Sequence, residues 1–344
     1  MTYLRNTWYV AAWAKELAPG AHIRRVILEQ PVLLWRSEDG VAHALSDRCP
    51  HRFAPLSLGT FSEGTVQCRY HGLKFDTGGR CVHNPAGSIP AAAKVPTFPL
   101  VERHSMLWVW MGEPGDADAT KIPSMDCQDP DKMWVGSDYL HVKSNYMLEI
   151  DNIMDLSHIE FLHASTLGAG GVAAGDYRAT QEGLQVWSRR LTHGEIMTDG
   201  LYDAMGLPRG KPVDRWIDVR WDAPANMVLW AGAVPTGRDR SEGSDTPTVH
   251  CFTPETASTT HYFFSVCFPK TLGNAGEEMA ARQIQYLRSP FEAEDLPMLE
   301  LQQANIGTVD LLSLKPVLLA GDAGGVRARR VLEKLIAAEQ VARA

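Results

Sequence analysis

Two pairs of metal-binding side chains constrain the fold of this chain more than any other feature. Cys49-Pro50-His51 is followed, after residues 52–67, by Cys68-Arg69-Tyr70-His71, which gives the spacing C-x-H…C-x-x-H. Short strand-like runs with turn signals surround the second pair, one turning at Glu63-Gly64 and the other at Thr77-Gly78-Gly79. The first part of the chain must therefore fold as hairpins that bring both pairs to a common site.

This ligand set has two interpretations. Two thiolates and two imidazoles hold a Rieske [2Fe–2S] centre, in which the cysteines bind one iron and the histidines the other. Zinc also accepts two cysteines and two histidines, although its ligand pairs more often read C-x-x-C or H-x3–5-H. The mixed C-x-H pair and its hairpin context favour the cluster, with Cys49, His51, Cys68 and His71 as ligands. A structural zinc site is the alternative.

A second group of candidate ligands lies between Asp151 and His163. His158 and His163, together with one carboxylate, would form the facial triad of non-haem Fe(II) oxygenases, which leaves positions open for O2 and substrate. The apolar spacing predicts a helix over residues 145–163. On an ideal helix the two histidines would lie about 140° apart, so the helix must distort or end if both bind one metal. Without a metal, both would be ordinary core or surface residues of that helix.

Acidic residues supply the remaining parts of this candidate site. Asp155 and His158 share a helix face, so we expect the Asp155 carboxylate to hydrogen-bond the non-ligating nitrogen of His158. The third ligand must come from elsewhere, and Glu292, Glu294 and Asp295 in the helical C-terminal region are the candidates. Spacing does not choose among the three, and a solvated helix face is the more usual place for any single acid.

Composition bounds the class of protein. The chain has 344 residues, of which 44% are hydrophobic and 22% charged, and its net charge is −8. This predicts a globular protein of two domains and argues against a nucleic-acid partner, which would require clustered Lys and Arg. We find neither a signal peptide pattern nor an apolar run of about 18 residues, and we expect a cytoplasmic enzyme. The four cysteines outside the metal motifs are expected to be free thiols.

The order of the predicted elements indicates an α+β fold. Residues 1–115 read as an all-β domain, and residues 112–130 read as the connection out of it. Residues 116–344 begin with the helix described above, continue as strands and end as helices, which predicts an antiparallel sheet flanked by helices. Within this part, the run Gly168-Ala169-Gly170-Gly171 lacks the βαβ setting of a dinucleotide-binding loop, so we expect an active-site loop there. The expected elements are strands at 32–35, 41–45, 106–111, 216–221, 226–234 and 261–268, and helices at 277–288, 291–304 and 326–343.

Taken together, these motifs resemble the Rieske non-haem iron oxygenase family. The resemblance is to the branch that contains vanillate O-demethylase, dicamba O-demethylase and toluenesulfonate methyl monooxygenase, and it covers essentially the whole chain. The stretches that carry it are 5–12, 49–57, 70–73, 151–158, 253–255 and 322–326.

The resemblance implies a role for each candidate residue. Cys49, His51, Cys68 and His71 would hold the cluster, and His158, His163 and Asp295 would hold the mononuclear iron. Asp155 matches a bridging carboxylate, and Asn152 matches an amide near the iron. The family also implies a head-to-tail homotrimer, in which His71 of one chain meets Asp155 of the next.

The resemblance further implies a function. The chain would be the terminal oxygenase component of a monooxygenase that uses O2 and a separate NAD(P)H-dependent reductase of the flavin or ferredoxin type. The expected reaction is O-demethylation of a small aromatic acid, with a vanillate-like methoxybenzoate as the expected substrate. Alternatives are methyl or ring hydroxylation of another aromatic acid such as a toluenesulfonate, and, more distantly, electron transfer without oxygenase activity.

One substrate contact also comes from the resemblance. His250 matches a position at which a dicamba-demethylating relative contacts the substrate carboxylate, and a buried strand histidine is the equal alternative. Leu229 stands where that relative has an amide, which argues against dicamba itself.

Overall fold

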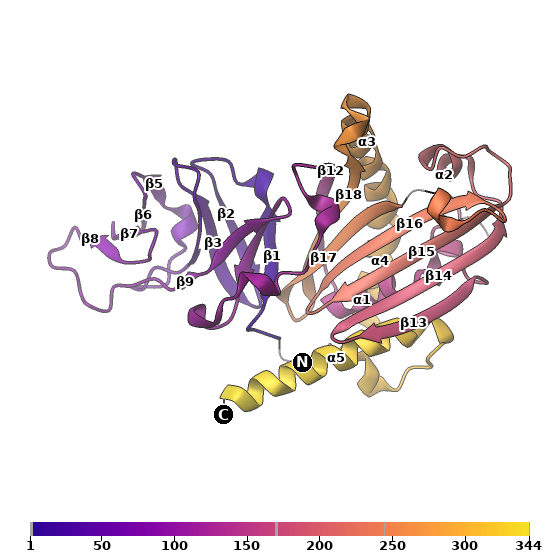
Figure 1. The fold of residues 1–344 in the computed structure, drawn as a ribbon. Coiled ribbons are helices and arrows are strands. Elements are labelled where there is room, and N and C mark those ends of the chain that lie inside the picture. The colour runs from indigo at the N-terminus through magenta and orange to yellow at the C-terminus, as the bar shows by residue number, and fades with distance from the viewer. Residues whose placement is uncertain (1–2, 169–170, 244, 344) are drawn as a thin grey trace. The chain divides into compact units, whose positions relative to one another are not determined.

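The computed structural model describes residues 3–168, 171–243 and 245–343, so the glycine-rich run 168–171 lies partly outside the described residues. The chain divides into two compact units. The N-terminal unit consists of residues 5–122 with 254–257, and the C-terminal unit contains residues 123–253 and 258–344 with the first four residues. Figure 1 shows the elements of both units.

The N-terminal unit is built from three small sheets. Their strand orders are β1-β11-β10, β2-β3-β4-β9 and β5-β6-β7-β8. The two hairpins predicted around the second metal motif are present as β5–β6 and β7–β8. The strands are β1 Trp8–Trp13, β2 His22–Ile27, β3 Gln30–Arg36, β4 Ala42–Ser46, β5 Thr60–Ser62, β6 Thr65–Gln67, β7 Lys74–Asp76, β8 Cys81–His83, β9 Thr97–Phe98, β10 Leu100–Arg103 and β11 Met106–Trp110.

The C-terminal unit is built on one seven-stranded antiparallel sheet in the order β12-β18-β17-β16-β15-β14-β13. Alternate residues of its central strands are apolar and point into the core, which is the pattern of a sheet covered on that face. The strands are β12 Met133–Val142, β13 Asp176–Glu182, β14 Gln185–Glu195, β15 Val213–Asp222, β16 Asn226–Pro235, β17 Thr246–Thr256 and β18 Thr259–Pro269. The α-helices are α1 Tyr146–Met154, α2 Asp199–Ala204, α3 Asn274–Pro290, α4 Leu296–Ile306 and α5 Ala323–Arg343.

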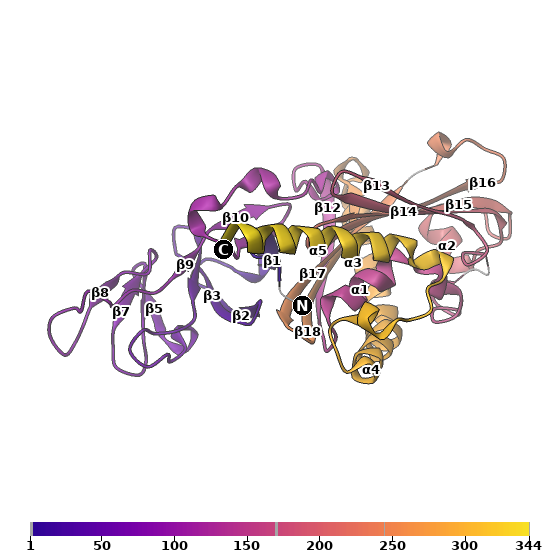
Figure 2. The same cartoon turned by 90° about the horizontal axis from the view of Figure 1, so that it is seen from below.

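Helices pack across this sheet and form the main core with it. Helix α3 packs on β12 and β18, α1 on β15, and α5 on β13 and β14. Figure 2 shows α5 running beside α1 across the strands. The predicted α+β class, with an all-β N-terminal part and a helix-flanked antiparallel sheet, is confirmed. No helix of the described residues combines the length and the hydropathy that a bilayer span requires.

The single helix predicted over residues 145–163 is wrong in its second half. Helix α1 begins after Asn145, whose side chain accepts a hydrogen bond from the Met147 amide at 3.0 Å, and it ends at Met154. Asp155 is extended, with φ −124° and ψ 92°, and its carboxylate accepts from the Ser157 amide, so it caps the 3₁₀ helix η6 that follows (Leu156–Glu160). An aspartate that bonds its own downstream backbone competes with a continuing α-helix, which explains the break.

Candidate metal centres and the pocket beside them

Two matching turns hold the cysteine and histidine pairs of the N-terminal unit. In each, the amide four residues after the cysteine donates to the cysteine carbonyl: Phe53 to Cys49 at 2.8 Å and Gly72 to Cys68 at 2.9 Å. Both donor residues have positive φ, 55° and 77°. Glycine adopts this conformation without strain and phenylalanine adopts it only at an energetic cost, so the first turn is strained and the second is relaxed. The two C-x-H and C-x-x-H halves are thus built as two copies of one local structure.

The four side chains divide between the core and the surface. Both sulfurs are buried beside apolar residues of the N-terminal core, whereas both imidazoles are exposed, with ring centroids 4.5 Å apart. Burial raises the pKa of the Cys49 thiol to about 11. A thiol with so high a pKa ionises readily only when a metal stabilises the thiolate. The arrangement therefore fits a metal cluster bound by the buried sulfurs on one side and by the exposed imidazole nitrogens on the other.

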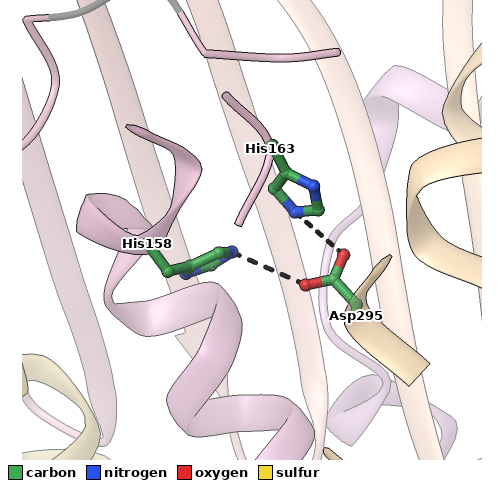
Figure 3. Close-up of side chains that lie close together, drawn as sticks. All are labelled: His158, His163 and Asp295. Atoms are coloured by element: carbon green, nitrogen blue, oxygen red, sulfur yellow. Dashed lines mark ion pairs between the residues drawn. The ribbon is translucent and has the colours of Figure 1, made fainter. Parts of the chain in front are cut away.

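The second group of ligands converges in the C-terminal unit. One ligand atom each from His158, His163 and Asp295 lie within 4.8 Å of one another. The Nε2 atoms of the two histidines point toward the two oxygens of Asp295, at 3.7 Å for His158 and 3.1 Å for His163, as Figure 3 shows. Two imidazoles and one carboxylate on one side of a shared point are the donor set of a mononuclear iron that keeps open positions. The residues present fit that metal.

The other ring nitrogen of each histidine is engaged by the protein. His158 Nδ1 lies 2.8 Å from the backbone carbonyl of Asp155, and His163 Nδ1 contacts the carboxylate of Glu294. The expectation that the Asp155 carboxylate bonds His158 is therefore wrong, because the break in the helix aims the carbonyl of that residue, and not its side chain, at the ring. Each contact holds the ring proton on Nδ1. The Nε2 atom of each imidazole then carries no proton and can bind a metal.

The Asp155 carboxylate has other partners. Its Oδ1 accepts from the Ser157 amide at 3.0 Å and pairs with Arg190 Nη2 at 3.1 Å. Gly321 packs directly on it, since a Cβ at that position would lie 2.1 Å from Oδ2. Asn152, the nearby amide, donates from Nδ2 to Asp295 Oδ1 at 3.0 Å. Asn152 therefore steadies the carboxylate ligand, and Arg190 steadies Asp155.

A π-helical turn places the two acidic residues around His163. The segment η9, Phe291–Asp295, is a π-helix between α3 and α4, and the Leu296 amide donates five residues back to Phe291. Pro290 precedes it and Pro297 follows it, and neither has an N–H to continue an α-helical ladder. The widened turn lets Glu294 and Asp295, which are consecutive, contact opposite nitrogens of one imidazole. Glu292 instead points outward and pairs with Arg288 at 3.1 Å.

The two histidines differ in electrostatics. Burial lowers the pKa of His158, and Asp295 opposes that effect without cancelling it. Burial also disfavours the charged form of His163, but Asp295 and Glu294 outweigh it, so the pKa of His163 is raised. The difference follows from the number of carboxylates at each ring.

A pocket opens beside the three converging ligands. It has a volume of about 140 Å³ and is bounded by η6, by the end of α3 and by the covered face of β15 to β18. His250, the candidate substrate contact, lies in its wall, fully buried. Its Nε2 is 2.9 Å from Thr248 Oγ1 and its Nδ1 is 2.7 Å from the Tyr262 hydroxyl, and burial lowers its pKa to about 3. His250 is thus a neutral ring with both nitrogens occupied.

Sequence reasoning missed some residues of this region. Glu294 was only one of three ligand candidates, and its role beside His163 depends on the π turn, for which the two prolines were the available signal. Arg190 and Arg215 belong to neither metal motif. Arg215 alternates with Ile217 and Val219 on a strand face that is otherwise apolar, and this was the signal in the sequence.

Comparisons with known proteins agree along the whole chain. Residues 7–99 match the Rieske [2Fe-2S] domain, and residues 142–338 match the vanillate O-demethylase oxygenase C-terminal domain. The chain is 36% identical to the dicamba O-demethylase oxygenase component of Stenotrophomonas maltophilia, over 97% of this chain and 98% of that one. It is 34% identical to a vanillate O-demethylase oxygenase subunit of a Pseudomonas species, over 93% and 98%. Its fold matches a crystal structure of dicamba monooxygenase bound to 3,6-dichlorosalicylic acid with a TM-score of 0.89 and 35% identity, over 99% of each chain.

Proposed function

This chain belongs to the Rieske non-haem iron oxygenases, in the branch of the vanillate O-demethylase oxygenase subunits, and we propose that it removes the methyl group of a small methoxylated aromatic acid. It is the oxygenase component of a multicomponent monooxygenase. The observation that carries the proposal is the pocket of about 140 Å³ whose wall includes His158, His163 and Asp295. An apolar cavity of roughly 150 Å³ is large enough to hold one benzene ring.

We assign the ligands as follows. Residues 1–115 carry the [2Fe–2S] cluster on Cys49, His51, Cys68 and His71, and residues 116–344 carry the mononuclear iron. His158, His163 and Asp295 would bind that iron, and the pairing of each Nδ1 with a protein acceptor supports this assignment. When bound, the two groups would supply stored electrons and the activation of O2.

The residues of the chain position and protect this chemistry. Asn152 and Glu294 hold Asp295 and His163 in orientation, and Asp155 fixes His158 through its carbonyl. The pocket is lined mainly by apolar side chains, which exclude water from the reacting group. The overall reaction would consume one methyl aryl ether, O2, two electrons and two protons, and release a phenol, formaldehyde and water.

His250 and Leu229 shape the wall that faces the substrate. A neutral, doubly hydrogen-bonded His250 contributes a rigid polar edge, and Leu229 contributes an apolar one. Since Leu229 cannot hydrogen-bond a carboxylate, we propose a methoxybenzoate other than dicamba as substrate.

Electron delivery would involve further chains. A separate NAD(P)H-dependent reductase would supply the electrons, and we propose a homotrimer in which His71 of one chain approaches Asp155 of the next. His71 is exposed, and Phe53 and Tyr70 beside the cluster turns are 71% and 60% exposed. Val317 and Leu319, which shortly precede Gly321 at the Asp155 carboxylate, are 87% and 70% exposed. Exposed apolar side chains mark surfaces that bind protein where they form a contiguous patch.

The test is a substrate screen with the oxygenase, a compatible reductase, NADH and O2. Methoxybenzoates, 4-toluenesulfonate and chlorinated benzoates would be supplied separately, with formaldehyde and product mass as readouts. Formaldehyde in a ratio of about one to the phenol formed supports the proposal. Oxygen incorporated into a methyl group or a ring, without formaldehyde, would instead assign methyl or ring hydroxylation.

A further inference from the structure

A buried ion pair forms part of the pocket wall, away from the ligand cluster described above. Arg215 lies on β15, and its side chain is on the covered face of the sheet, together with Ile217. Glu195, at the end of β14, approaches Arg215 Nη1 at 3.5 Å. The two residues are 5% and 4% exposed. Among the described residues that line the pocket, Arg215 is the one arginine or lysine.

The hydrogen-bonding capacity of this pair is largely unused. Neither Nε nor Nη1 of Arg215, and neither carboxylate oxygen of Glu195, has a hydrogen-bond partner among the described residues. Buried charged groups are normally hydrogen-bonded, because an unsatisfied one costs free energy of desolvation. A guanidinium with five donors that makes one loose ion pair is therefore ready to bind a further acceptor.

The neighbouring strands leave room for that acceptor inside the pocket. Arg215 is paired in register with Ala233, and the next inward-facing residue of β15, Ile217, is paired with Ala231. Both partners are alanines, which have short side chains, and Arg215 and Ala231 line the pocket. Thr246, which is paired with Ala231 on β17, adds a hydroxyl at the same end of the pocket. This end is polar, whereas Ile217 and Leu229 make the adjoining floor apolar.

We propose that Arg215 is the residue that anchors the anionic group of the substrate, with Glu195 holding the guanidinium from the other side. This inference rests on the proposed function, because it assumes that the pocket takes an aromatic acid. A carboxylate or sulfonate would accept hydrogen bonds from the guanidinium, and the ring would lie over Ile217 and Leu229. The opposite end of the ring, which carries the group to be oxidised, would then face His158, His163 and Asp295.

Arg215 suits this role better than His250 does. His250 has both nitrogens occupied and is neutral, so it offers neither a free donor nor a charge. Arginine keeps its charge and matches the two oxygens of a carboxylate with two parallel N–H groups. The preference for an acid over a neutral aromatic compound therefore depends on Arg215.

The experiment measures equilibrium binding to the anaerobic, iron-loaded protein by calorimetry. The probes are the anions 4-methoxybenzoate and 4-toluenesulfonate, and the neutral 4-methoxybenzamide. The variants are Arg215→Met, Glu195→Gln and the double variant Arg215→Met/Glu195→Gln. The double variant matters because Arg215→Met alone leaves Glu195 buried without a counter-charge, which can damage the fold. Circular dichroism and iron content check each variant.

We expect both variants that lack Arg215 to bind the anions roughly 10- to 100-fold more weakly, the effect of one charge-assisted hydrogen-bonded contact. The benzamide should change by less than about threefold, and Glu195→Gln should keep the preference for anions. The proposal is overturned if the double variant binds the anions as the wild type does, since the pair is then structural only. It is also overturned if the wild-type protein binds no anion more tightly than the benzamide, or binds neither.

Formaldehyde release separates this inference from the proposed function. If the anions bind in an Arg215-dependent way but no methoxylated acid releases formaldehyde, the anchor stands and the demethylation proposal fails. If methoxybenzoates are demethylated and loss of Arg215 leaves KM and kcat unchanged, the anchor fails and the demethylation proposal stands.

Discussion

Each imidazole of the candidate iron site is held by a hydrogen bond from its Nδ1 atom, but the two acceptors differ in charge. A neutral backbone carbonyl holds His158, whereas the carboxylate of Glu294 holds His163 and also accepts from Thr166 Oγ1 at 2.9 Å. Because carboxylate support raises the basicity of a ligating histidine, the larger contribution to metal affinity should come from the Glu294 side. Glu294 acts through His163 and is a positioning residue.

Replacing Glu294 by alanine should weaken iron(II) binding at this site by about 10- to 100-fold while the cluster stays intact. The variant keeps all three candidate ligands and loses only the carboxylate that supports His163. Glu294→Gln should restore part of the affinity because it keeps an acceptor. Competition with a chelator measures the affinity, and visible absorbance reports the cluster. Glu292→Ala is the matched control, because Glu292 lies in the same π turn but pairs outward with Arg288. Equal affinities in Glu294→Ala and Glu292→Ala would contradict the role.

The sequence displays the candidate ligands through their spacing, but it does not display the residues that support them. The spacing of Cys49, His51, Cys68 and His71 is a local property, and two matching local turns realise it. Glu294 and Arg215 gain their roles from tertiary contacts. Glu294 contacts His163, and Arg215 lines the pocket. Such contacts leave no regular spacing in the sequence, so no periodic pattern could reveal them.

At the scale of elements, two interruptions of helices build the candidate iron site. Helix α1 ends at Met154 so that His158 and His163 reach the same point, which a continuous helix would prevent. The π turn before α4 brings Glu294 and Asp295 to one ring. Helical spacing keeps His158 and His163 too far apart around the helix to share a metal, so a distortion or end of the helix near them could be predicted from the sequence. Its exact residue depends on the capping bond of Asp155, which apolar periodicity does not report.

Helix α1 also carries a buried acid that should make stability depend on pH. Burial raises the pKa of Glu149 to about 8, and the Ser144 hydroxyl donates to its carboxylate. The unfolded value is about 4.3, so between roughly pH 4.5 and 8 the folded protein binds a proton that the unfolded chain lacks. The stabilisation linked to this bound proton is complete below pH 4.5. As the pH rises to 8 it is lost, and the free energy of unfolding falls by up to about 1.4 kcal/mol per pH unit.

The variant Glu149→Gln keeps the shape of the side chain and removes this titration. We expect the free energy of unfolding of the wild type to fall relative to Glu149→Gln as the pH rises from 5 to 8, with the variant becoming the more stable protein at the upper end. Urea unfolding followed by circular dichroism at several pH values measures the difference. Parallel pH profiles for the two proteins would mean that Glu149 ionises normally in the fold.

At the scale of the whole molecule, Asp155 is the residue on which the proposed assembly depends. Its carbonyl holds His158 and its carboxylate, paired with Arg190, remains partly exposed at the surface. In the proposed trimer, this partly exposed carboxylate would receive the histidine of another chain. The sequence suggested this arrangement only through the family resemblance, because no spacing within one chain encodes a contact between chains.

The variant Asp155→Asn tests whether Asp155 serves electron transfer between chains or is needed to keep the metal sites occupied. The backbone carbonyl that holds His158 and one side-chain acceptor remain, so we expect both metal sites to stay occupied. Electron transfer from the cluster should fall by at least about tenfold, because the side chain that would receive His71 of the next chain loses its charge. Single-turnover oxidation of the pre-reduced protein with substrate and O2 measures the rate, and an iron count is the control. A normal rate and product yield would show that electrons do not pass by this residue.

In the proposed function, one chain carries both a Rieske cluster and a mononuclear iron. Quantitative iron, zinc and acid-labile sulfide analysis of the purified protein counts both groups, with Cys68→Ser and His158→Ala analysed beside the wild type. We predict about three irons and about two sulfides per chain, loss of the cluster in Cys68→Ser, and loss of about one iron with both sulfides retained in His158→Ala. Zinc in place of iron would rule out the cluster, and an iron content that His158→Ala leaves at the wild-type value would rule out His158 as a ligand.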